Sequence, residues 1–206
     1  MLESKIMNGN INKERYYYGI KNRSHISKSK IIKNGMSNNI DINEIWTLNY
    51  NQMSGIRYMF CESLSYPIFI SVYDVNKRSL CAANLFKPDS SVINYLSKIL
   101  SKMSSMQSKS SPSLEGRIFG MQNDQSTALL IDIIRLFASN NISLVEADLF
   151  GSELRNIAID AHLGMSFNLL ALDRVYRPGE LNYSKTMIQF EYDNRDRLKY
   201  IKDLLK

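Results

Sequence analysis

The chain has 206 residues, of which 44% are hydrophobic, and a formal net charge of +6. This length and composition suffice for one substantial core, so we expect one domain plus a tail. No run of about 18 apolar residues occurs, which excludes a membrane-spanning helix, and the N-terminus lacks the apolar region of a secretory signal. Two cysteines are too few for a disulfide scaffold and are not spaced as zinc ligands, which favours a reducing cytoplasm and no cofactor or metal.

The excess positive charge lies near the N-terminus. Residues 1–40 contain eight basic and two acidic residues, whereas residues 41–206 contain eighteen of each. We therefore expect a basic tail over residues 1–40, either a solvated, disordered arm or a helix docked on the domain, and a single domain over residues 41–206. Nucleic acid is an unlikely partner for this neutral domain. Three consecutive tyrosines in the tail, Tyr16, Tyr17 and Tyr18, are expected to pack it against its own domain rather than to stack on bases.

Strand-like segments open the domain. Residues 44–50 and 55–62 are rich in β-formers and are separated by a polar turn. Residues 67–74 are nearly all apolar or β-branched, which is typical of a strand buried on both faces. Residues 79–86 follow a polar turn at 76–78 and are expected to pair with that strand, with Cys81 as a buried structural thiol.

Helices and strands then alternate. An apolar stripe at helical spacing predicts a helix over residues 91–103, with Asp89, Ser90 or Ser91 as its N-cap. Residues 104–113 are a low-complexity linker that we expect to form a mobile surface loop. The stripe of the first helix comprises Val92, Tyr95, Leu96, Ile99, Leu100 and Met103.

The rest of the chain continues the alternation. We expect a strand at 116–121, a helix at 124–141, a strand at 142–150, two strands within 153–175 that turn at 162–164, a strand at 186–193 and a helix at 195–206. The pattern predicts an α/β domain in which a strongly twisted, mixed sheet packs helices against its faces. The acidic pairs Glu146/Asp148 and Asp193/Asp196 lack facing partners, so we expect them to be solvated.

From about Cys61 to Leu172 the order of these segments resembles the CheD family, the chemoreceptor glutamine deamidases of bacterial chemotaxis. The stretches LSYPIFISVYD and LCAANLFKPDSS resemble the family's turn into a buried strand and the following strand, and RIFGM resembles its IFGGA. In ISLVEADLFGSELRNIAIDAHLGMSF, residues Asp148, Gly151, Arg155 and Gly164 fall where the family pattern has a strand-ending acid, a glycine turn, a basic residue and a second turn.

The chain departs from the family at the residues that perform the chemistry. The resemblance places Pro67 at the position of the nucleophilic cysteine and Asn84 at that of its histidine partner, while Cys61 occupies a nearby threonine position. Proline has neither a nucleophilic atom nor an N–H, and asparagine does not exchange protons near neutral pH. Deamidation by this route needs a thiolate, a base and oxyanion donors. The resemblance therefore implies a degenerate, catalytically inactive member.

We accordingly expect a CheD-like regulatory protein that acts in bacterial signalling by binding a protein partner, such as a receptor or another signalling protein. The resemblance implies a binding pocket around the vacated centre, by which we mean the positions of Pro67 and Asn84. It also implies that the protein acts in the bacterial cytoplasm. Its expected residues are Cys61, Tyr66, Pro67, Asn84, Phe119, Gly120 and Met121.

Two alternatives remain open. The first is a cysteine-dependent protein glutamine amidohydrolase with relocated groups, in which Cys61 is the nucleophile, His162 the base, and Asp148 or Asp160 the orienting carboxylate. The second is a type III secreted effector acting in a host, because the Ser/Asn-rich N-terminus resembles such export signals.

Overall fold

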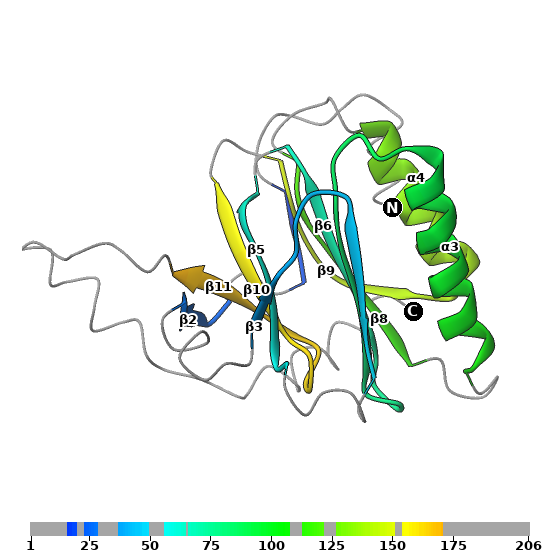
Figure 1. Ribbon diagram of the computed structural model, residues 1–206, viewed down its shortest axis with the longest axis horizontal. Helices are drawn as coiled ribbons and strands as arrows, with labels where there is room; N and C mark the ends of the chain where they lie inside the picture. Colours follow the sequence, from blue (N-terminus) through cyan, green and yellow to red (C-terminus); the bar gives the residue numbers. More distant parts are fainter. Residues whose placement is uncertain are drawn as a thin grey trace, which may run out of the picture.

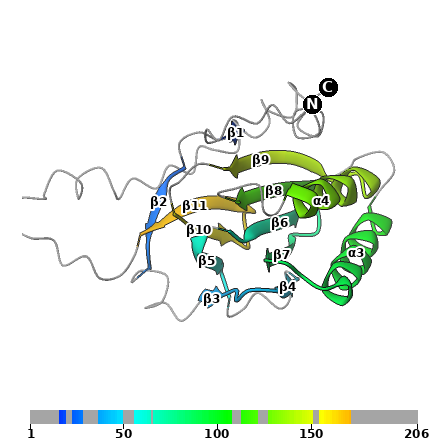
Figure 2. The ribbon, with the colours of Figure 1, turned by 90° about the horizontal axis from the view of Figure 1, so that it is seen from above.

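The protein has three layers in its computed structural model, which describes residues 16–19, 23–28, 37–49, 56–64, 66–107, 113–121, 127–150 and 154–170. In this part of the chain two helices cover a six-stranded sheet, and a five-stranded sheet packs on its other side (Figures 1 and 2). The domain is therefore mixed α/β, as the alternation of segments predicts. Most of its elements are strands.

The six-stranded sheet forms the middle layer. Its neighbouring strands are antiparallel, except that β8 and β9 run parallel. In order across the sheet the strands are β1 (Tyr16–Tyr18), β9 (Ser143–Leu149), β8 (Leu114–Gly120), β6 (Ile68–Asp74), β7 (Ser79–Leu85) and β4 (Glu44–Leu48). All seven residues of β6 are buried, which confirms the prediction of a strand buried on both faces.

The five-stranded sheet forms an outer layer. Its outermost strand on each side pairs in parallel with its neighbour, and the inner pairs are antiparallel. In order the strands are β2 (His25–Ser27), β11 (Met165–Leu170), β10 (Arg155–Asp160), β5 (Tyr58–Leu64) and β3 (Ser37–Asn39). Strands β1, β2 and β3 come from the range expected to be a tail. These segments are strands of the two sheets rather than a disordered arm or a docked helix.

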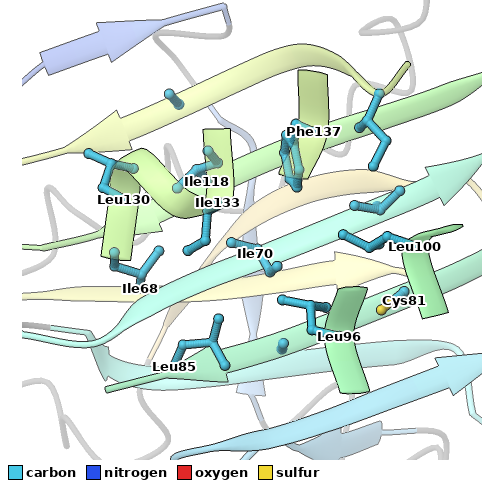
Figure 3. Packing of buried hydrophobic residues seen from close by; sticks show 14 of the residues in the cluster. Ile68, Ile70, Cys81, Leu85, Leu96, Leu100, Ile118, Leu130, Ile133 and Phe137 are labelled. Carbon is cyan, nitrogen blue, oxygen red and sulfur yellow. The ribbon is translucent and has the colours of Figure 1, made fainter. Parts of the chain in front are cut away.

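Both helices lie on the same face of the six-stranded sheet. Helix α3 (Ser90–Ser105) begins at the N-cap Asp89, whose carboxylate accepts hydrogen bonds from the backbone of the first turn, and α4 (Thr127–Ser139) follows β8. In Figure 3 the helices point apolar side chains at the sheet, among them Leu96 and Leu100 of α3 and Leu130 of α4. The expectation of helices on both faces is wrong, because the other face is covered by a sheet.

Apolar side chains between the two sheets explain why a sheet, and not a helix, covers the second face. Alternate residues of β6 face opposite sides, so that Ile70 packs under the helices while Phe69 packs toward the second sheet. There Phe69 joins Met59 of β5 and Ile157 of β10 in one buried cluster. Strands of both sheets show the same two-residue periodicity, so the sequence pattern does not say that they form two sheets.

Some predicted segments fall outside the described residues. They are the strand at 186–193, the helix at 195–206 with Asp193 and Asp196, and the middle of the 104–113 linker. The hairpin turns before β7 and β11 are confirmed. None of the described helices is long and apolar enough to cross a membrane.

Candidate functional site

Pro67 and Asn84, the positions that the resemblance assigns to the family's reactive pair, lie at the same end of the β6–β7 hairpin. Phe69 of β6 pairs directly with Asn84 of β7, and Pro67 precedes β6 two residues before Phe69. Pro67 and Asn84 are therefore diagonal neighbours at one end of the sheet. The side chain of Asn84 is buried, with 3% of the residue exposed.

The chain's own residues 40–43, which we call the strap, cover this end of β7. The side-chain amide of Asn84 donates to the carbonyl oxygen of Ile40 at 3.1 Å, and its backbone carbonyl accepts from the N–H of Asn43 at 2.6 Å. Asn43 also exchanges two hydrogen bonds with the backbone of Phe86, at 2.9 and 3.1 Å. Its φ of +63° lies in the left-handed region, which asparagine tolerates better than most residues.

The strap also joins the two sheets. The N–H of Ile40 donates to the carbonyl of Phe60 in β5 at 2.9 Å, and the Ile40 side chain is 1% exposed. It lies in the cluster that contains Cys61 and Phe119. The space beside Asn84 is therefore filled by apolar side chains and closed by backbone hydrogen bonds.

The remaining residues of the expected pocket are largely core residues. The rings of Phe69 and Phe119 lie 6.0 Å apart between the sheets, whereas Met121 is buried in the cluster under the helices. Gly120 has a φ of +103°, and a Cβ there would lie 2.2 Å from the carbonyl oxygen of Pro67, so glycine permits the close approach of these strands. Of the seven expected binding residues only Tyr66 is exposed.

Cys61 and His162 are not brought together. Cys61 is opposite Ile157 in the β5–β10 ladder, whereas His162 lies in the turn that follows β10, five residues beyond Ile157. The backbone of His162 is held by Asp160 and by the hydroxyl of Tyr73. Its imidazole Nε2 is buried and has no hydrogen-bond partner among the described residues.

Neither thiol is activated. Burial, with smaller contributions from the charges of Asp41 and Glu62, raises the pKa of Cys61 to about 12. Burial alone raises the pKa of Cys81 to about 12, which agrees with its expected role as a structural thiol in β7. A nucleophilic cysteine needs the opposite shift, which a nearby cation or base would supply.

The pair Glu146 and Asp148 is buried, so the expectation that it is solvated is wrong. Both residues are 0% exposed, and both bind the guanidinium of Arg23, with 2.7 Å between Arg23 and Asp148. Arg155 also binds Asp148 at 2.9 Å. The two acids lie on the face of β9 that packs against the second sheet. Arg23 reaches them there, and its guanidinium carbon lies 4.7 Å from the centroid of the Phe119 ring.

The network continues into β8. Arg117 lies 3.6 Å from Glu146 and 3.1 Å from Glu115, and the hydroxyl of Ser166 donates to Glu146 at 2.5 Å. The network thus contains three guanidinium groups and three carboxylates, and its formal charge is zero. Burial lowers the pKa of Arg23, but the charges of Glu146 and Asp148 more than offset this and raise it overall.

The arrangement is suited to holding the layers together rather than to catalysis. Each acid is ion-paired, and no group of three potential ligands that would hold a metal occurs within the described ranges. The sequence contains a local signal for this network. Glu115 and Arg117 on one strand, and Glu146 and Asp148 on another, are spaced two residues apart and so share a face.

No protein-family model matches this chain, and no curated protein matches it significantly.

Proposed function

We propose that the protein is a catalytically inactive relative of the CheD deamidases that acts by binding another protein. The observation that carries the proposal is the side chain of Asn84. At the position of the family's histidine, its amide is bonded to Ile40 behind the strap and is 3% exposed. A substrate carboxamide would have to displace the strap to reach it.

Two further contacts support the resemblance on which the proposal depends. Pro67 and Asn84, which align with the family's reactive pair, are diagonal neighbours on adjacent strands. Asp148 and Arg155, which align with two other positions of the family pattern, form an ion pair of 2.9 Å.

The relocated amidohydrolase has less support. It requires a thiolate beside a base, yet the pKa of Cys61 is about 12 and His162 lies near the other end of the β10 ladder. Losing members of a catalytic unit lowers turnover by a factor on the order of 10⁴ to 10⁶. Recognition without turnover is therefore the function that the geometry supports best.

Incubation of the purified protein with a helical peptide that carries glutamine and glutamate tests the proposal. Binding is followed by fluorescence anisotropy, and conversion by ammonia release and peptide mass. We expect binding without conversion.

The variants Cys61→Ser and Cys81→Ser serve as a matched pair. Conversion by the unaltered protein that Cys61→Ser abolishes and Cys81→Ser preserves would overturn the proposal in favour of the amidohydrolase. Absence of any binding would contradict the proposal that the protein recognises a receptor segment of this kind.

A further inference from the structure

A basic groove lies apart from the vacated centre. It runs between α3, the turn joining β6 to β7, and the edge strand β4, and its volume is about 1010 Å³. Helix α3 lies on the side of β7 and β4 in Figure 2. The helix lines the groove from Tyr95 to Met106, which corresponds to a length of about 17 Å. A smaller hollow of about 310 Å³ on the other side of Tyr95 reaches Asn43 of the strap.

All the charged residues that line the groove are basic. Its lining includes Lys77, Arg78, Lys98 and Lys102 and no aspartate or glutamate. Lys77 donates to the carbonyl of Met106 at 2.8 Å, which brings the turn against the end of the helix. Lys98 and Lys102 are exposed, and no carboxylate among the described residues pairs with them. Clustered cations on a concave surface attract anionic groups.

The groove also contains apolar side chains that the fold leaves uncovered. Tyr95, which helical spacing assigns to the core stripe, is 58% exposed, and Met106 is 46% exposed. Ile99 is half-buried between them, and Met103 is buried beneath. Exposed apolar groups gathered in a hollow are typical of an interaction site, and methionine adapts to the shape of a ligand.

We propose that this groove binds an acidic segment of a partner protein. Carboxylates of the segment pair with Lys98 and Lys102, and its apolar side chains pack on Tyr95 and Ile99. The inference deepens the proposed binding function and rests on it, since it names the surface and the chemistry of the partner. Burial of the vacated centre leaves recognition to an outer surface such as this one.

The ends of the same chain do not have the complementary charge. Residues 1–40 carry eight basic and two acidic residues, a net +6, and residues 171–206 carry eight basic and six acidic residues, a net +2. A nucleic acid would find one aromatic side chain in the lining, Tyr95, whereas single-strand binding uses several stacked aromatics. A hollow about 17 Å long fits a peptide segment better than it fits a membrane surface.

Fluorescence anisotropy with a synthetic amphipathic peptide of leucine and glutamate tests the inference. The peptide contains no glutamine, so it reports on the groove alone. We expect it to bind the full-length protein, and we expect the double variant Lys98→Glu/Lys102→Glu to bind about tenfold more weakly at low salt. Tyr95→Ala should also weaken binding, and added salt should weaken the unaltered protein's binding.

Arg135→Glu is the matched control, because Arg135 is an exposed cation on α4 that does not line the groove. It should leave peptide affinity within about twofold of the unaltered value. Circular dichroism confirms that each variant is folded. A second peptide with lysine in place of glutamate should not bind.

Three results would overturn the inference. They are no binding of the acidic peptide, binding that the groove variants do not weaken, and binding of phosphatidylserine vesicles or of single-stranded DNA that depends on Lys98 and Lys102 as strongly as peptide binding does. Each leaves the proposed function to be judged by the glutamine assay. Conversely, conversion of the glutamine peptide would contradict the proposed function and leave the groove result unchanged.

Discussion

The two faces of the six-stranded sheet are built differently. The face under the helices is apolar throughout its core, with Ile70, Leu100, Ile133 and Phe137 among its buried side chains. The face toward the second sheet combines an apolar cluster with a buried network of three arginines and three acids. Apolar side chains can pack against many different apolar surfaces, whereas buried ions need oppositely charged groups at defined positions. The second face therefore determines how the segment that carries Arg23 attaches to the sheet.

The largest effect is expected where the ion network is broken. Asp148→Ala removes a buried carboxylate that binds both Arg23 and Arg155, so the positive charge of the network is no longer balanced, although Arg23 keeps Glu146. This loss should lower the free energy of unfolding by about 3–5 kcal/mol. Urea denaturation measures this change. Asp132→Ala, at an exposed acid on α4, is the control and should change stability by less than about 0.5 kcal/mol. Equal, small effects at both sites would show that Asp148 is solvated.

A smaller effect is expected at the strap. Asn84→Ala leaves the carbonyl of Ile40 without its donor, which should cost about 1–3 kcal/mol. Hydrogen exchange should quicken at the amides of Ile40 and Asn43 but not in α4. Ser71→Ala is the control, because the Ser71 hydroxyl is buried without a partner among the described residues. Unchanged exchange at Ile40 and Asn43 would mean that Asn84 does not hold the strap.

The helix-facing side should respond more weakly to a small change. Ile133→Val removes one methylene group from the apolar cluster and should lower stability by about 0.5–1.5 kcal/mol. Thermal or urea unfolding measures the loss, and hydrogen exchange at the strap should stay as in the unaltered protein. Faster exchange at the strap in this variant would mean that the two faces are not independent.

The smallest effect is expected at the N-cap of α3. Hydrogen bonds from the Ser91 hydroxyl and from the N–H of Val92 lower the pKa of Asp89. A lowered folded-state pKa stabilises the protein above the unfolded pKa of about 4, and this contribution is lost as pH falls through the folded value. Asp89→Asn keeps the cap acceptor but does not titrate.

Melting temperatures of the Asp89→Asn variant and the unaltered protein should therefore converge as the pH falls below about 4. A difference that is constant from neutral to acidic pH would contradict the assignment of Asp89 as a charged cap.

The sequence predicted one face of the sheet much better than the other. Helical spacing identified Leu96, Leu100 and Ile133 as core, and the apolar run at 67–74 identified the central strand, because these signals depend on residues close in sequence. Arg23 and Asp148 are 125 residues apart, so no local pattern indicates that they meet.

The candidate site was predictable only in part. The predicted pairing of residues 67–74 with 79–86 anticipated that Pro67 and Asn84 lie near each other, but not that Ile40 and Asn43 would close the space beside them. Those contacts depend on the path of the strap, residues 40–43, which lies where composition placed the boundary between tail and domain. Tyr95 shows a related limit, since helical spacing gives the direction of a side chain but not whether a partner layer reaches it.

The alkylation rates of the two cysteines in the native protein test most directly whether the space around Cys61, Pro67 and Asn84 is closed. Iodoacetamide labelling at neutral pH, followed by mass spectrometry, reports each thiol separately. With pKa values of about 12 and burial at both sites, Cys61 and Cys81 should react equally slowly and only as fast as the protein unfolds. Rapid labelling of Cys61 while Cys81 stays unmodified would contradict the account, because it would mean that the centre is open and holds a reactive thiol.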